Sequence, residues 1–149
     1  MANDAGWTLV TGASEGIGLE LARVAAKSGR SVILAARQAE KLNALAEELR
    51  GKHNVGVDVI PADLSTEAGA EALWEAATAD GRRIDFLINN AGLGSNGPFA
   101  EPATWERERA SVMVNVLALT ILMKRAVPHM AEHGRGRILN VASVAGFMA

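Results

Sequence analysis

Short apolar runs alternate with longer amphipathic segments along the whole chain. The runs at residues 8–11, 31–36, 55–60, 84–88 and 138–141 predict five strands. The run at residues 31–36 is apolar on both faces, as is typical of a parallel strand that helices cover on both sides. The pattern therefore predicts a sheet buried between helices.

Apolar residues at helical spacing predict a helix after each of the first three strands. The predicted apolar faces are Ile17, Leu21, Val24 and Ala25 in the first helix, Leu42, Leu45, Ala46 and Leu49 in the second, and Ala70, Leu73, Trp74 and Ala77 in the third. Gly29, Gly51 and Gly81 are placed to end these helices. Ser65 is the predicted N-cap of the third helix.

A longer helix is predicted to begin at Thr104 and to reach toward His133, with a kink or local break at Pro128. Between residues 112 and 123 this helix is apolar almost all round. A helix of that kind is either deeply buried or packed against another subunit.

The order of the elements is βαβαβαβαβ, with no repeat, no low-complexity stretch and no linker. Such alternation is typical of an α/β fold with right-handed crossovers and helices on both faces of a parallel sheet. The sequence therefore predicts a single domain over residues 1–149. Its expected form is a three-layer Rossmann-type doubly wound parallel sheet, with five strands in the order 3-2-1-4-5.

Composition and charge narrow the function classes. Hydrophobic residues make up 49% of the chain and charged residues 21%, which indicates a globular protein. The net charge is −2 with mixed signs and no basic stripe, so no nucleic-acid partner is expected. The absence of cysteine excludes disulfides and fits a cytoplasmic location. His53, His129 and His133 are scattered, so no metal site is predicted.

No membrane association is expected either. The first residues lack the basic and apolar regions of a signal peptide. The longest apolar run, residues 112–123, is shorter than the ~20 residues that a membrane span needs.

A glycine-rich segment, TGASEGIG at residues 11–18, follows the first strand and opens the first helix. Gly12, Gly16 and Gly18 let the backbone approach a phosphate, which the free N–H groups of the helix N-terminus attract. Ser14 can donate its hydroxyl to a pyrophosphate. The alternative is a turn whose glycines only set backbone angles, but its place in a βαβ unit favours dinucleotide binding. The literal G-x-G-x-x-G, residues 92–97, follows the fourth strand and is interpreted as a flexible loop at the rim of the site.

The residue after the second strand selects the cofactor. An acid there would bind the ribose 2′-hydroxyl of NAD. This chain has Ala36 and then Arg37, whose guanidinium can pair with a 2′-phosphate, so NADP(H) is favoured over NAD(H). A solvated surface arginine is the alternative. Glu15 argues against NADP, because a carboxylate in the glycine-rich turn repels a phosphate.

Four motifs together resemble those of the short-chain dehydrogenase/reductase family. They are TGASEGIG, NNAG at residues 89–92, Asn115, and Ser143 within NVASVAG at residues 140–146. The resemblance implies that the pyrophosphate is held by Gly12, Ser14, Gly16, Ile17 and Gly18. It also implies Asp63 and the Leu64 backbone at the adenine, and Asn90, Ala91 and Gly92 along the adenosine ribose. A homodimer or homotetramer built partly on the helix around Asn115 is implied as well.

Each of these residues also has a structural interpretation. Asp63 is placed as an ordinary loop acid before a helix. Asn89 and Asn90 can satisfy backbone groups at a strand end. Asn115, buried in an apolar helix, must find polar partners whatever else it does. Ser143 can be a turn serine, and the G-x-S-x-G pattern of a hydrolase nucleophile is absent.

The resemblance implies an oxidoreductase that transfers hydride between a nicotinamide and a carbonyl or alcohol substrate of small-molecule size. In the family a tyrosine in a Tyr-x-x-x-Lys segment exchanges the proton, the serine orients the substrate oxygen, and the asparagine holds a water. Ser143 and Asn115 are present, but the chain has no tyrosine. We therefore expect these 149 residues to bind cofactor without catalysis. The alternatives are a non-catalytic dinucleotide-binding or redox-sensing module, and a decayed gene product that hardly folds.

Overall fold

A computed structural model describes residues 6–94, 98–101 and 104–144. Five parallel strands form one sheet in the order β3-β2-β1-β4-β5, which confirms the predicted fold and strand order. The strands are β1 (Trp7–Thr11), β2 (Val32–Ala36), β3 (Val57–Pro61), β4 (Ile84–Asn89) and β5 (Arg137–Asn140). Their limits differ from the predicted ones by one or two residues.

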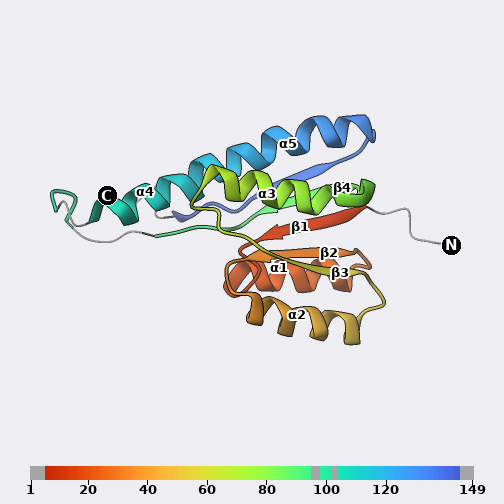
Figure 1. Cartoon of the computed structure of the whole chain (residues 1–149). Helices are drawn as coiled ribbons and strands as arrows, with labels where there is room; N and C mark the ends of the chain where they lie inside the picture. The colour runs from red at the N-terminus through yellow and green to blue at the C-terminus, as the bar shows by residue number, and fades with distance from the viewer. Residues whose placement is uncertain (1–5, 95–97, 102–103, 145–149) are drawn as a thin grey trace.

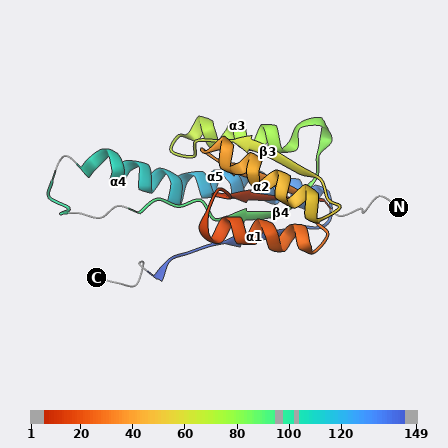
Figure 2. The same cartoon turned by 90° about the horizontal axis from the view of Figure 1, so that it is seen from below.

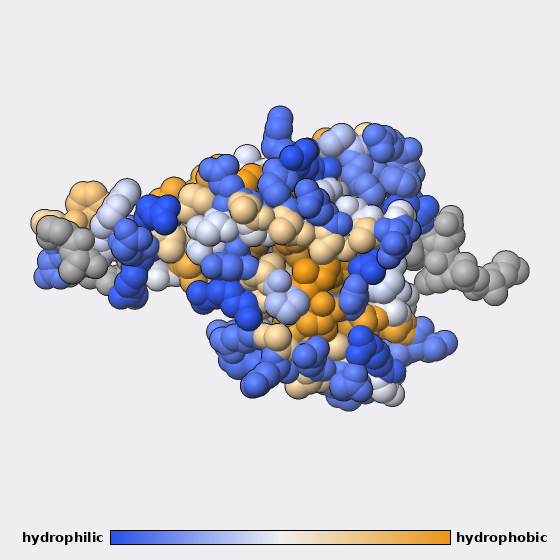
Figure 3. Space-filling model, viewed as in Figure 1, coloured by the Kyte–Doolittle hydropathy of each residue, from blue (hydrophilic) through white to orange (hydrophobic). Residues whose placement is uncertain are grey.

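Helices cover both faces of the sheet. They are α1 (Gly16–Lys27), α2 (Ala39–Lys52), α3 (Glu67–Thr78), α4 (Trp105–Val112) and α5 (Leu119–Glu132), with a 3-10 turn at Ala79–Gly81 and a π-helical segment at Met113–Ala118. α1 and α2 lie on one face, and α3 and α5 lie on the other (Figure 1). α4 extends beyond the carboxyl ends of the strands in both views (Figures 1 and 2). Hydrophobic residues show at the surface over the β2–β3 edge of the sheet, between α3 and α2 (Figure 3).

The predicted apolar face of α1 is wrong at two positions. Ile17 and Val24 are 61% and 63% exposed, and the buried residues are instead Gly18, Ala22, Ala25 and Ala26. Small side chains let this helix lie close to the sheet, so the face that packs is marked by size rather than by hydrophobicity. The close approach matters because α1 begins at the glycine-rich turn.

The predicted N-cap of α3 is also wrong by one residue. Thr66 is the cap, and its Oγ1 accepts the N–H of Gly69 at 3.0 Å. The N–H of Ser65 instead donates to Oδ1 of Asp63 at 3.0 Å. Because Asp63 forms this turn with Ser65, the helix begins one residue later than the pattern predicted.

The long helix begins after Thr104 as predicted, but it does not break at Pro128. Proline has no N–H, so the carbonyl of Lys124, four residues earlier, lacks its helical hydrogen bond. Both residues are exposed, so water can bond to that carbonyl instead. The departure from α-helical geometry lies instead at Met113–Ala118.

The burial of this helix is one-sided. Val114, Ala118, Leu122, Ala126 and Met130 are buried, whereas Val112, Val116 and Val127 are 57–60% exposed. By length and composition alone, the continuous helix Trp105–Glu132 could cross a membrane. This differs from the sequence-based expectation, in which the apolar run of residues 112–123 was too short. Only 22% of its most apolar window is buried, and that buried face packs in the hydrophobic cluster between the sheet and α3.

His129 attaches the end of α5 to the start of β4, a contact that the sequence did not predict. Its Nε2 accepts the N–H of Ile84 at 3.0 Å, and the ring meets Trp74 edge to face with centroids 5.4 Å apart. Burial, and then the neighbouring His133, lower the pKa of His129 below its ordinary value. The neutral ring is therefore the form that the fold uses.

Lowering the pH from about 7 to about 5 is expected to reduce the free energy of unfolding. The pKa of His129 in the folded chain lies below the ~6.5 of an unfolded histidine. The unfolded state then binds more protons, so stability is lost as the pH falls through about 6.5. Urea unfolding at several pH values measures this slope. His129→Gln should flatten it, and His53→Gln, at the C-cap of α2, should not. An unchanged slope in His129→Gln would contradict this assignment.

Candidate cofactor-binding site

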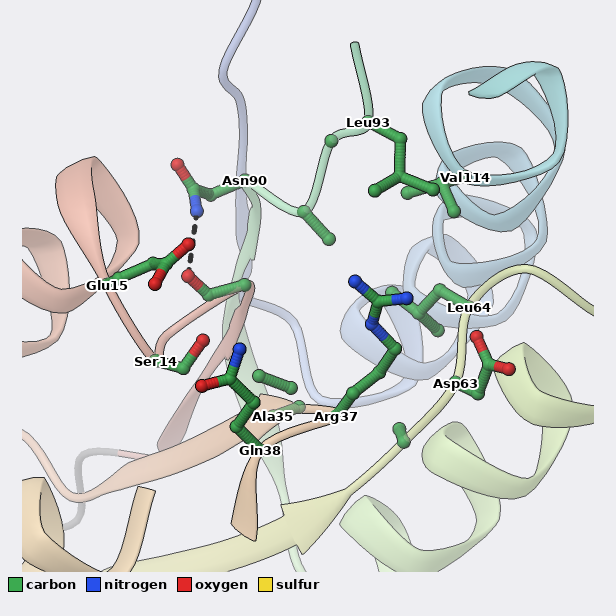
Figure 4. A pocket seen from close by; sticks show the side chains of 15 residues that line it. Ser14, Glu15, Ala35, Arg37, Gln38, Asp63, Leu64, Asn90, Leu93 and Val114 are labelled. Carbon is green, nitrogen blue, oxygen red and sulfur yellow. Dashed lines mark hydrogen bonds between the residues drawn. The ribbon is translucent and has the colours of Figure 1, made fainter. Parts of the chain in front are cut away.

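A pocket of about 260 Å³ lies at the carboxyl ends of the central strands. Its walls come from the β1–α1 turn, the end of β2, the segment after β3 and the segment after β4. The lining residues are Gly12, Ser14, Glu15, Ala35, Ala36, Arg37, Gln38, Ala62, Asp63, Leu64, Asn90, Ala91, Gly92, Leu93 and Val114 (Figure 4). Ligands of open α/β sheets bind at this edge, where the strand order reverses beside β1.

The β1–α1 turn is bonded to the end of β4 through Thr11 and Asn90. Oγ1 of Thr11 accepts the N–H groups of Asn90 and Ala91, each at 3.0 Å, and donates to the carbonyl of Ile88 at 3.3 Å. Nδ2 of Asn90 donates to the carbonyls of Thr11 at 3.1 Å and Gly12 at 3.2 Å. We call this set of bonds the Thr11–Asn90 contact. Asn90 thus has the structural role that was one interpretation of the sequence, and it also lines the pocket.

Two glycines are required by this contact. A Cβ at Gly18 would lie 2.3 Å from both the Gly12 carbonyl oxygen and Nδ2 of Asn90. A Cβ at Gly12, whose φ is +66°, would lie 2.8 Å from the same Nδ2. Residues larger than glycine would push the turn away from β4.

The third glycine faces open space. Gly16 has φ of +58°, and a Cβ there would meet nothing within 4 Å. Gly16 begins α1, so the backbone N–H groups of the first helical turn have no partner one turn back. An open, positively polarised helix start of this kind fits a pyrophosphate.

The wall opposite the glycine-rich turn carries Asp63 and Leu64, with Arg37 between the two walls (Figure 4). The backbone N–H of Ser65, then its hydroxyl, and also the Arg37 charge hold the pKa of Asp63 below its ordinary value. Asp63 is therefore an anion at neutral pH, available to accept hydrogen bonds from an amino group. Leu64 is buried and gives this wall an apolar surface.

Asn115 is exposed, so the expectation of a buried asparagine is wrong. Its amide bonds both to Leu93, in the segment after β4, and to Ser111, in the last turn of α4. Oδ1 accepts the N–H of Leu93 at 2.9 Å, and Nδ2 donates to the Leu93 carbonyl at 2.8 Å and to Oγ of Ser111 at 3.1 Å. It lies within the π-helical segment, a departure that is frequent at functional sites. Its partners are the Leu93 backbone and Ser111, one turn earlier in the same helix, so Asn115 is hydrogen-bonded without being buried.

Ser143 follows β5 and is exposed, and it does not belong to the pocket lining. The strand before it is bonded to β4 beyond the regular ladder. Nδ2 of Asn89 donates to Oδ1 of Asn140 at 3.0 Å, and the N–H of Val141 donates to the Asn89 carbonyl at 2.9 Å. Residues 145–146 of the serine motif lie outside the described residues, as do residues 95–97 of the loop predicted at the rim.

Most of the predicted cofactor residues gather in one place. Those that line the pocket are Gly12, Ser14, Arg37, Asp63, Leu64, Asn90, Ala91 and Gly92. Gly16, Ile17 and Gly18 lie next to it on α1, with the Ile17 side chain exposed. Sequence reasoning missed the hydroxyl of Thr11, whose place directly before Gly12 was the available signal. Leu93 belongs to the loop that was predicted at the rim of the site, and Val114 carried no signal beyond its hydrophobicity.

The whole described chain matches a known family. The family model described as short chain dehydrogenase matches residues 6–149. Nodulation protein G of Rhizobium sp. (strain N33) is 39% identical over 140 residues, which are 93% of this chain and 54% of that protein. The very-long-chain 3-oxoacyl-CoA reductase of Aspergillus fumigatus is 32% identical over 143 residues, 95% of this chain and 41% of that protein. The chain thus spans about half the length of the curated relatives it matches, or less.

Solved structures agree with the fold. A short-chain dehydrogenase from Sphingobium yanoikuyae in complex with NADPH has a TM-score of 0.85 and 37% sequence identity, over 96% of this chain and 55% of that one. A 7beta-hydroxysteroid dehydrogenase has a TM-score of 0.87 and 34% identity, over 95% of this chain and 54% of that one.

Gly18→Ala is expected to destabilise the chain by about 1–3 kcal/mol, because the new methyl group must displace the Asn90 amide and the Gly12 carbonyl. Urea unfolding measures the change. Gly51→Ala is the matched control, since a Cβ at that position in α2 meets nothing within 4 Å. Alanine there should be neutral or stabilising by up to about 1 kcal/mol. Equal effects at both positions would show that the close approach at Gly18 is not a constraint.

Proposed function

Since this chain belongs to the short-chain dehydrogenase family, we propose that it is the cofactor-binding part of an NADP-dependent oxidoreductase. The complete protein would interconvert a small-molecule carbonyl and an alcohol. The observation that carries the proposal is the glycine-rich turn, bonded by the Thr11–Asn90 contact above a pocket that Arg37 enters. In the bound state the nicotinamide supplies or accepts the hydride.

The preference for NADP rests on the end of β2. β2 ends at Ala36, and the next residue that lines the pocket is the cation Arg37, where an acid would bind a ribose 2′-hydroxyl. A guanidinium forms charge-assisted hydrogen bonds with a phosphate. Two similar solved proteins support this choice, the Sphingobium yanoikuyae dehydrogenase in complex with NADPH and a metagenomic short-chain oxidoreductase, 36% identical, in complex with NADP.

Two residues are proposed to act on the substrate side. The Ser143 hydroxyl orients the substrate oxygen. Asn115 holds the Leu93 backbone beside the pocket and so positions the loop that covers it. Both donors of its side-chain amide are used, so a water in the proton relay would have to donate to an oxygen of Asn115.

These 149 residues contain no tyrosine, and we propose that they bind NADPH without turnover. The absorbance of NADPH should then stay constant when a ketone is added to the purified chain. The pocket also supports a second candidate, a non-catalytic dinucleotide-binding or redox-sensing module. Consumption of NADPH with a carbonyl substrate by the protein isolated from its own cells would decide against that module.

A homodimer or homotetramer is part of the proposal. Val112, Val116 and Val127 lie exposed on the side of the long helix away from the sheet, where they support contact with a second copy. A molar mass from light scattering that equals one 15.6 kDa chain would count against it.

Arg37→Gln is expected to weaken NADPH binding about 10- to 100-fold, the loss of one charge-assisted hydrogen-bonded contact. NADH binding should stay within about twofold, because NADH lacks the phosphate that the guanidinium would meet. Titration of the intact chain, followed by nucleotide fluorescence, gives both affinities. Arg107→Gln, on the exposed surface of α4, is the control and should change neither. A parallel loss of NADPH and NADH affinity in Arg37→Gln would contradict the assignment.

A further inference from the structure

A second cation stands at the mouth of the same pocket. Lys41 lies in the first turn of α2, and its Nζ is 2.8 Å from Oε2 of Glu15, the carboxylate of the glycine-rich turn. Glu15 lines the pocket on the side opposite Asp63 (Figure 4). The ion pair thus joins the start of α2 to the place where phosphate groups are expected.

Both charged side chains lie where their local electrostatic surroundings do not favour them. A lysine in the first turn of a helix faces the positive end of the helix dipole, which disfavours it. A carboxylate at the start of α1 competes with any anion that binds there. The two side chains remain 50% and 70% exposed, so their ion pair adds little to the stability of the fold. Neither charge is explained by the packing of the chain.

A 2′-phosphate would give the ion pair a function. It carries about −1.5 to −2 charges near neutral pH, so an unpaired Glu15 would repel it and a nearby ammonium would attract it. Lys41 comes four residues after Arg37, across the N-cap of α2, so both cations belong to one short connection beside the pocket.

We propose that Lys41 is a second specificity-determining cation for the 2′-phosphate, and that it exchanges Glu15 for the phosphate when NADP binds. Glu15 holds Lys41 at the pocket in the free chain and competes with the phosphate for it. The pair therefore sets the strength of NADP binding, with Arg37 as the first cation. This inference rests on the proposed function, because it requires that the pocket binds a dinucleotide.

Three variants separate the roles of the two charges. Lys41→Gln should weaken NADPH binding about tenfold, because it removes the cation and leaves Glu15 unpaired. Glu15→Gln should strengthen NADPH binding about two- to fivefold, because Lys41 is released and the repulsion is gone. The double variant should fall between them. NADH affinity should move in the same direction but less than NADPH affinity in all three, because NADH shares the pyrophosphate near Glu15 and lacks the 2′-phosphate that the exchange needs.

Lys52→Gln is the matched control. Lys52 lies at the other end of α2 and pairs with Glu48 at 2.9 Å, so the variant removes the same kind of ion pair outside the pocket lining. It should leave both affinities unchanged. Titrations at several salt concentrations add a second readout. The dependence of NADPH binding on salt should become shallower in Lys41→Gln and stay unchanged in Lys52→Gln.

The outcomes distinguish this inference from the proposed function. If the unaltered chain binds neither nucleotide, the proposed function fails and the inference with it. If the chain binds NADPH in an Arg37-dependent way while Lys41→Gln behaves like Lys52→Gln, the proposed function stands and the inference is overturned. Tighter binding of NADPH by Glu15→Gln, together with the weakening in Lys41→Gln, supports the exchange.

Discussion

The site depends on the Thr11–Asn90 contact. The hydroxyl of Thr11 and the amide of Asn90 together satisfy backbone groups at the ends of two neighbouring strands, in a place where the regular ladder has stopped. These bonds fix the glycine-rich turn against the end of β4. They also make Gly18 obligatory, because the first turn of α1 must pass within contact distance of the same amide. The start of α1 is thereby held at the pocket edge.

Charged side chains lie at different positions around the pocket, and each position suits a different part of a ligand. Asp63, whose pKa is lowered mainly by the backbone N–H of Ser65, offers an acceptor on one wall. Arg37 stands between the walls, and Glu15 and Lys41 neutralise each other at the mouth. In the proposed complex, NADP would place its 2′-phosphate at the cations and its adenine beside the acceptor. The order of these charges agrees with the strand order: Glu15 follows β1, Arg37 and Lys41 follow β2, and Asp63 follows β3 at the same sheet edge.

Much of this could be predicted from the sequence. Strands that are apolar on both faces can only lie inside a layered structure, and alternation with helices makes their sheet parallel. The glycines of residues 12–18 and the asparagines after β4 could be placed at one edge for the same reason. The face of α1 that packs on the sheet could not be predicted. Alanines make that contact, whereas the spacing of hydrophobic residues gives more weight to Ile17 and Val24. The N-cap at Thr66 depends on the hydrogen bond between Ser65 and Asp63, and the exposed position of Asn115 goes with its hydrogen bond to Leu93. A pattern of apolar positions contains no information on such polar contacts.

The central claim is that a dinucleotide binds on the glycine-rich turn that the Thr11–Asn90 contact holds in place. Titration of the isotope-labelled chain with NADPH, followed through its backbone amide resonances, tests it most directly. The account predicts that the amides of Gly12, Gly16, Gly18 and Ala91 shift together with one affinity. It also predicts that Gly134, which follows α5, does not shift. Shifts confined to other parts of the chain, or no shift at saturating NADPH, would contradict it.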